Sequence, residues 1–159
     1  MKSKQAGRLS SWTRHSVEDA LRSAGLRVTR GRLAVLSALN DRPHSGAETV
    51  LAAVQPALPG TSIQNIHNVL GDLTLAGMLR RIEPTHSPAL YERRIGDNHH
   101  HIVCTLCSTV ADVDCVVGHA PCLRPSEAAG FAVDTAEVTF WGLCPSCQES
   151  TAEAPSRSE

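Results

Sequence analysis

Residues 99–107 read His-His-His-Ile-Val-Cys-Thr-Leu-Cys, and residues 141–147 read Trp-Gly-Leu-Cys-Pro-Ser-Cys. Each stretch ends in two cysteines with two residues between them, and 36 residues separate the two pairs. A structural zinc ion takes four thiolates in a tetrahedron, commonly from two such pairs, whereas a dithiol redox pair is the alternative use of the motif. We therefore predict a structural zinc site formed by Cys104, Cys107, Cys144 and Cys147.

Charge is divided unevenly along the chain of 159 residues. Residues 1–95 carry 13 Lys and Arg against 7 Asp and Glu, while residues 96–159 carry 2 against 9. A basic part suggests a polyanion partner, and an acidic part rich in His and Cys suggests cations. This division predicts two domains, at 15–95 and 96–147, flanked by a disordered basic arm at 1–14 and a disordered tail at 148–159.

The start of the chain has no apolar run of the kind that a signal peptide contains, and no stretch approaches the length that spans a membrane. We therefore expect a cytoplasmic protein without a membrane partner. In a reducing cytosol, paired cysteines are better interpreted as metal ligands or redox centres than as structural disulfides.

The first domain shows the apolar spacing of four helices. Residues that favour a helix N-cap indicate that the helices begin near Ser16, Thr29, Ser45 and Ser62, with Ser45 and Glu48 forming a capping box. Two extended runs, 78–82 and 89–93, then predict a hairpin with basic residues. Helices followed by such a hairpin predict a winged helix-turn-helix, in which one helix enters the major groove of double-stranded DNA.

The helix that begins at Ser62 has an apolar face and an opposite polar face. Amide and imidazole side chains on that polar face can donate to base edges or phosphates. A small helical domain with polar surface amides is the alternative interpretation. We predict the following DNA contacts: Arg30, Arg32, Ser62, Gln64, Asn65, His67, Asn68 and Tyr91.

Short β-type runs dominate the second domain, at 101–103, 109–113, 131–133 and 137–141. The fold class is therefore α+β. On a strand, His99 and His101 project to the same face, and Asp112 and Asp114 follow a short way downstream. Imidazoles with carboxylates suit an exchangeable site for divalent iron, manganese or zinc, although a solvated polar strand end would show the same pattern.

These motifs together resemble the ferric uptake regulator family of bacterial repressors, over about residues 16 to 147. They include Pro43-His44-Ser45, Leu90-Tyr91-Glu92 and both cysteine stretches. Within the family, the chain looks most similar to the peroxide-responsive branch and to actinobacterial repressors of catalase-peroxidase genes. The resemblance implies a homodimer that binds a palindromic operator, with a small α+β dimerisation domain. It also implies a regulatory metal held by His44, Glu92, His99, His101 and Asp112.

Several positions depart from the family pattern. The family usually has Val-Tyr where this chain has Ile66-His67, which affects the operator sequence and a phosphate contact. The carboxylate at position 92 is Glu, where the peroxide-sensing branch typically has Asp. The family's additional metal site uses a late histidine that Asp134-Thr135-Ala136 does not supply, so we predict no third metal site.

The resemblance implies a metal-dependent repressor that responds to peroxide, with regulatory Fe²⁺ or Mn²⁺. The alternative is an iron-, zinc- or nickel-responsive repressor of metal uptake genes, with Zn²⁺ or Ni²⁺ in that site. A zinc-ribbon interaction module that does not bind DNA is the alternative of another class. Cys115 and Cys122 are interpreted as buried thiols, with a redox switch as the alternative.

We expect no enzyme activity. A zinc deaminase needs a His-x-Glu motif and a Pro-Cys-x-x-Cys motif, and this sequence contains neither. A thioredoxin-like oxidoreductase would place a Cys-x-x-Cys motif within a βαβ pattern, which the second domain lacks.

Overall fold

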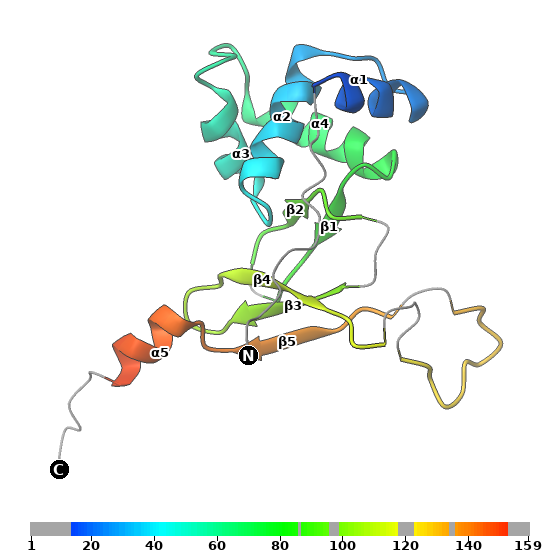
Figure 1. Cartoon of the computed structure of the whole chain (residues 1–159), viewed down its shortest axis with the longest axis vertical. Coiled ribbons are helices and arrows are strands. Elements are labelled where there is room, and N and C mark those ends of the chain that lie inside the picture. Colours follow the sequence, from blue (N-terminus) through cyan, green and yellow to red (C-terminus); the bar gives the residue numbers. More distant parts are fainter. Residues whose placement is uncertain (1–13, 86, 96–98, 118–122, 134–135, 153–159) are drawn as a thin grey trace, which may run out of the picture. The chain divides into compact units, whose positions relative to one another are not determined.

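The computed structural model describes residues 14–85, 87–95, 99–117, 123–133 and 136–152 (Figure 1). The chain divides into two compact units. The N-terminal unit comprises residues 1–81 with 91–93, and the C-terminal unit comprises residues 82–90 with 94–159. This division differs from the predicted single boundary after Ile95, because residues 82–90 belong to the C-terminal unit. The predicted basic arm lies outside the described residues, except for Arg14.

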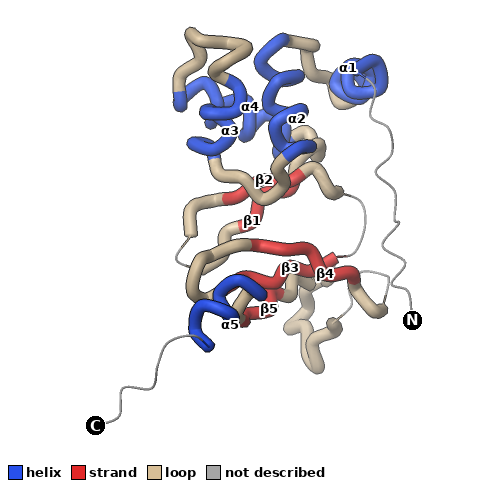
Figure 2. The backbone as a smooth tube through the Cα atoms, turned by 60° about the vertical axis from the view of Figure 1, so that its left-hand side comes forward, coloured by secondary structure: helices blue, strands red, loops and turns tan. Residues whose placement is uncertain are grey.

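Four helices form the N-terminal unit: α1 (Arg14–Ser23), α2 (Arg30–Asp41), α3 (Ala47–Val54) and α4 (Ile63–Leu75). Figure 2 draws them in blue. The apolar residues spaced by three and four along each helix turn to the inside, as the sequence predicted. The helices α2, α3 and α4 all contact one another. The most deeply buried side chains of this core are Leu21, Val35, Leu36, Leu39, Val50, Ile66, Leu70 and Leu73.

Two of the four predicted N-caps are confirmed. Thr29 Oγ1 accepts a hydrogen bond from the Arg32 N–H at 3.2 Å, and Ser62 Oγ accepts one from the Asn65 N–H at 3.2 Å. Each cap satisfies one of the N–H groups that lack a partner in the first helical turn. Helices α1 and α4 are followed two residues later by Gly25 and Gly77, which have φ angles of 72° and 66° and so use the left-handed region that glycine adopts without steric cost.

The other two predicted N-caps are wrong. Helix α1 already begins at Arg14, two residues before Ser16, and ion pairs from Arg14 to Glu18 and from His15 to Asp19 support its first turn. Gly46 caps α3 without a side-chain hydrogen bond. The Ser45 hydroxyl instead donates to the Arg42 carbonyl, so the predicted capping box does not form.

The predicted hairpin is present as strands β1 (Arg80–Ile82) and β2 (Leu90–Glu92), which form a two-stranded sheet. Four helices followed by this sheet give the predicted order of a winged helix. An isolated bridge between Ser45 and Tyr91 ties the residues before α3 to β2. This bridge fixes the chain on either side of it, including His44 and Glu92.

The C-terminal unit contains a three-stranded sheet in the order β4-β3-β5. Strand β3 (His99–Cys104) is antiparallel to β4 (Val110–Asp114) and parallel to β5 (Thr139–Gly142). The predicted strand at 131–133 does not form. A turn with positive φ at Ala129 and Gly130 precedes it, and the Phe131 N–H donates back to the Ala128 carbonyl.

Helix α5 (Pro145–Ala152) corrects the prediction of a disordered tail from Gln148. Proline is favoured in the first turn of a helix because the N–H that it lacks would have no partner there. The Gln148 backbone N–H donates to the Cys144 carbonyl, and the Gln148 amide side chain donates to the Leu143 carbonyl at 2.7 Å. Residues 153–159 lie outside the described part of the chain. Within that part, none of the helices is long and apolar enough to cross a membrane.

The α4 core allows a test of the fold by substitution. Leu70 is fully buried and Leu75, on the same helix, is 91% exposed. We expect Leu70→Ala to lower the free energy of unfolding by about 2–5 kcal/mol, because it removes buried methyl groups and leaves a cavity. Leu75→Ala should change it by less than about 0.5 kcal/mol. Urea unfolding followed by far-ultraviolet circular dichroism measures both, and equal effects would contradict the packing described.

Candidate metal centres and DNA-binding surface

The four cysteines predicted to hold zinc come together at one end of the sheet in the C-terminal unit. All four Sγ atoms lie within 4.8 Å of one another. The Sγ atoms of Cys107 and Cys144 are 3.7 Å apart. A tetrahedral zinc with Zn–S bonds of about 2.3 Å needs sulfur atoms about 3.8 Å apart, so this cluster fits a structural zinc site. Four protein ligands leave no open position for catalysis.

Local backbone geometry builds this cluster from β3 and the segment after β5. The Ser108 N–H donates to the Cys104 carbonyl at 2.9 Å, and Ser108 has a φ of 60°, so the chain turns sharply after Cys107. The Thr105 N–H donates to the Gly142 carbonyl at 2.8 Å, which joins the first cysteine pair to the chain just before Cys144.

Hydrogen bonds within the cluster shift the pKa values of two of its thiols in opposite directions. Backbone hydrogen bonds from Cys107 and Cys144 lower the pKa of the Cys104 thiol to about 6. Hydrogen bonds with the side chains of Cys144 and Cys107 raise the pKa of the Cys147 thiol to about 12. A bound divalent ion supplies the charge that favours four thiolates together.

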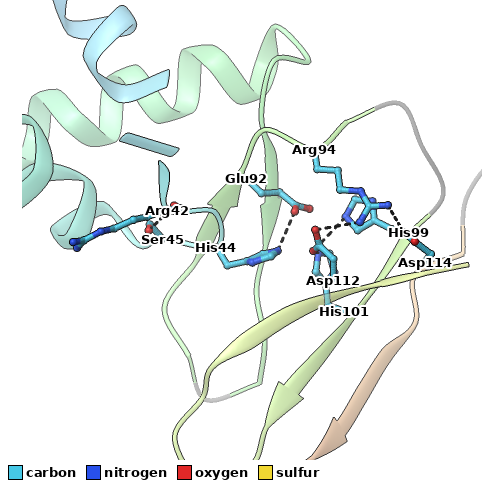
Figure 3. A network of polar contacts seen from close by, with 9 residues as sticks. All are labelled: Arg42, His44, Ser45, Glu92, Arg94, His99, His101, Asp112 and Asp114. Atoms are coloured by element: carbon cyan, nitrogen blue, oxygen red, sulfur yellow. Dashed lines mark hydrogen bonds and ion pairs between the residues drawn. The ribbon is translucent and has the colours of Figure 1, made fainter. Parts of the chain in front are cut away.

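A second set of metal-ligating groups lies in the N-terminal unit. His44 Nε2 is 3.0 Å from Glu92 Oε2, and the two side chains are 9% and 0% exposed (Figure 3). The bridge between Ser45 and Tyr91 places these two residues beside each other. His44 has a φ of 56°, which is uncommon for a residue other than glycine and is often found at functional sites. A buried carboxylate is costly unless a cation or proton lies against it.

A third set lies in the C-terminal unit, on one face of β3 and β4. His99 and His101 are two residues apart on β3, so their side chains point to the same face of the sheet. His101 lies directly opposite Asp112 on β4. Asp112 Oδ1 is 3.7 Å from His101 Nε2 and 4.0 Å from His99 Nε2. Both imidazoles are almost fully buried. His100 points to the other face, where its ring lies 6.2 Å from that of Phe140.

Four of the predicted DNA contacts form one exposed surface on α4: Gln64, Asn65, His67 and Asn68. Arg30 is exposed at the start of α2. Ser62 is exposed and also caps α4. These residues are accessible to a nucleic acid, and their contacts with DNA stay predictions.

Two of the predicted DNA contacts have structural partners within the N-terminal unit. Arg32 forms an ion pair with Asp72 at 2.7 Å and donates to the Arg27 carbonyl at 2.8 Å, which ties α4 to α2. Tyr91 is buried and its backbone bridges Ser45. Arg32 and Asp72 are forty residues apart, so the sequence alone does not identify them as partners.

The two remaining cysteines are Cys115 and Cys122, and Cys115 is not part of the four-cysteine cluster. Cys115 is half-buried just after β4, and Cys122 lies outside the described residues. The redox role of either thiol stays a prediction.

Four helices and a two-stranded hairpin, followed by a sheet with a four-cysteine cluster, are the arrangement expected of a metal-responsive DNA-binding regulator. The Ferric uptake regulator family matches residues 23–140, and the chain belongs to this family. It is therefore a metal-responsive transcriptional repressor, in a family of transcription factors and not of enzymes. The predicted α+β fold, with a winged helix-turn-helix before a small α+β domain, is confirmed.

Individual relatives refine this assignment. The transcriptional regulator FurA of Mycobacterium tuberculosis (strain H37Rv) is 56% identical over 132 residues, which cover 83% of this chain and 90% of FurA. The peroxide-responsive repressor PerR of Staphylococcus epidermidis is 28% identical over 144 residues, which cover 85% of this chain and 92% of PerR. The solved structure of the ferric uptake regulator Fur of Helicobacter pylori aligns with a TM-score of 0.64 at 18% identity, covering 91% of this chain and 93% of that one. This last likeness supports the fold.

The zinc assignment is testable with a matched pair of cysteine variants. We expect the wild-type protein to hold about one tightly bound zinc per chain and Cys147→Ser to lose it, because three thiolates no longer complete the tetrahedron. Elemental analysis after dialysis against a chelator measures the zinc content. Cys115→Ser, which removes a cysteine outside the cluster, should retain the metal; loss of zinc from both variants would argue against the assigned ligand set.

Proposed function

We propose that the chain represses transcription as a homodimer when Fe²⁺ or Mn²⁺ occupies a regulatory site formed by His44, Glu92, His99, His101 and Asp112. The burial of the ligand groups carries this proposal. Glu92 has no exposed surface and faces His44 at 3.0 Å, while Asp112 faces two buried imidazoles. Imidazole and carboxylate groups that face one another at these distances within buried surroundings offer the donor atoms that a divalent cation would bind.

Each unit alone offers an incomplete ligand set. The N-terminal unit supplies one imidazole and one carboxylate, and the C-terminal unit supplies two imidazoles and one carboxylate. Together they give three nitrogen donors and two carboxylates, a set that suits Fe²⁺ or Mn²⁺, with Zn²⁺ and Ni²⁺ as alternatives. Ligands drawn from both units would couple metal binding to the orientation of α4, and therefore to the spacing of two recognition helices in a dimer.

The surface of the C-terminal unit supports the homodimer. Ile102, on β3, and Phe140, on β5, are register partners and are 39% and 45% exposed. Trp141 and Leu143 add further exposed apolar surface close by in the chain. A second copy of this chain is the occupant that we propose for this apolar surface, because a palindromic operator requires two recognition helices related by a two-fold axis.

A response to peroxide is the second candidate, favoured by the likeness to PerR and by the imidazoles of the proposed site. A ferrous ion bound there would supply the electrons that reduce peroxide, with oxidation directed at an adjacent ligand such as His99 or His101. Loss of that ligand would release DNA. The relatives named FurA and ferric uptake regulation protein have higher identities and favour iron regulation as the basic function.

The first prediction of this proposal concerns metal dependence. Mn²⁺ should tighten binding to a palindromic DNA, selected from a random pool, by about 5–150-fold. His101→Ala should abolish this increase because it removes a ligand, as measured by fluorescence anisotropy. His15→Ala removes an exposed imidazole from α1 and should keep the increase. DNA binding that ignores Mn²⁺ in the wild-type protein would favour the zinc-ribbon interaction module or another class of partner.

The second prediction concerns peroxide. Protein loaded anaerobically with Fe²⁺ should lose DNA binding after hydrogen peroxide is added, and mass spectrometry should find one added oxygen atom on the peptide with His99 and His101. Mn²⁺-loaded protein is the control and should resist. A response that persists without histidine oxidation but disappears in the double variant C115S/C122S would favour the thiol mechanism. DNA binding that survives peroxide unchanged would contradict the peroxide response, and iron regulation would remain as the candidate function.

A further inference from the structure

Arg94 reaches across to two carboxylates of strand β4. Its Nη1 lies 3.3 Å from Asp112 Oδ2, and its Nη2 lies 2.5 Å from Asp114 Oδ1 (Figure 3). The three residues all belong to the C-terminal unit. One guanidinium therefore links a proposed metal ligand, Asp112, to a carboxylate that is not a ligand. The planar fork of an arginine suits such a two-point contact, whereas a lysine ammonium would act as a single point charge.

The two oxygens of Asp112 face different partners. Oδ1 faces the imidazoles of His101 and His99, at 3.7 Å and 4.0 Å. Oδ2 faces the guanidinium of Arg94. The carboxylate is thus oriented in the absence of any metal, with one oxygen directed at the two histidines and the other engaged elsewhere.

We propose that Arg94 is a positioning residue that makes Asp112 a one-oxygen ligand of the regulatory metal. This inference rests on the proposed function, because it assumes that His99, His101 and Asp112 bind metal. By holding Oδ2, Arg94 orients Oδ1 before the ion arrives, so less side-chain freedom is lost on binding. Outer-shell partners of this kind orient ligating carboxylates in metal sites generally.

Asp114 explains how a positive group can lie next to a cation site without repelling the ion. Its carboxylate is 87% exposed and contacts the same guanidinium. The pair of Arg94 and Asp114 carries no net charge, so Arg94 can orient Asp112 with little repulsion of the metal. The exposure of Asp114 also means that the ion pair contributes little to stability, which leaves orientation as its main role.

The test compares two variants with the same change in charge. Arg94→Gln removes the guanidinium that holds Asp112. Arg124→Gln removes an exposed arginine elsewhere in the C-terminal unit. Zinc-loaded, full-length proteins are titrated with Mn²⁺ for affinity and with Co²⁺ for the visible spectrum. We expect Arg94→Gln to bind Mn²⁺ about 10–100-fold more weakly and to change the Co²⁺ ligand-field bands, because Asp112 is free to reorient. Arg124→Gln should match the wild-type protein in both.

The outcomes separate this inference from the proposed function. Removing a positive charge would by itself tighten the binding of a cation, so Mn²⁺ affinity in Arg94→Gln that is unchanged or higher would overturn the positioning role. His101→Ala is measured in parallel. If His101→Ala binds Mn²⁺ as well as the wild-type protein, the regulatory site itself is wrong and the role of Arg94 is lost with it. If only His101→Ala weakens binding, the site stands and the inference about Arg94 fails.

Discussion

The crowding of four sulfur atoms in the C-terminal unit is the constraint on which that unit depends. Among its described residues after Arg94, the buried apolar side chains are Val103, Cys104 and Cys147, and two of these three belong to the four-cysteine cluster. A sheet of three short strands with so small a core is marginal by itself. Hydrogen bonds within the cluster lower the pKa of the Cys104 thiol and raise the pKa of the Cys147 thiol. A divalent ion held in the predicted zinc site would draw the cysteine pairs together and stabilise all four as thiolates.

The same physical principle operates at the proposed regulatory site with different ligands. Thiolates are soft donors that bind zinc tightly in a closed tetrahedron, whereas imidazoles and carboxylates suit harder ions that exchange. The chain separates the two sets by strand geometry. Cys104 ends β3 on the side of the cysteine cluster, while His99 and His101 occupy the alternate positions that face Asp112. One six-residue strand therefore contributes ligand groups to the predicted zinc site and to the proposed regulatory site.

The sequence predicted those features that depend on local chemistry or on a specific spacing. Thr29 and Ser62 cap helices as expected, and the two cysteine pairs converge. The failures involve contacts between distant residues. Ser45 pairs with Tyr91 and so does not cap α3, and the run at 131–133 follows a turn that removes it from the sheet. Helix α5 was missed because its composition resembles a disordered tail, while its first turns are anchored to Leu143 and Cys144. Arg94 gave no signal because its partners lie 18 and 20 residues away.

The backbone at His44 has a conformation that lowers the stability of the fold and is held in place by neighbouring contacts. A left-handed conformation at a residue other than glycine costs about 1–3 kcal/mol, and here it occurs at a proposed ligand. The adjacent bridge between Ser45 and Tyr91 holds the conformation, with backbone hydrogen bonds of 3.0 and 3.3 Å. The same bridge buries Glu92 beside His44, which adds the desolvation of a carboxylate to the conformational cost. A cation that engages both side chains offsets the second cost, so ligand binding at this point and order in the N-terminal unit are energetically linked.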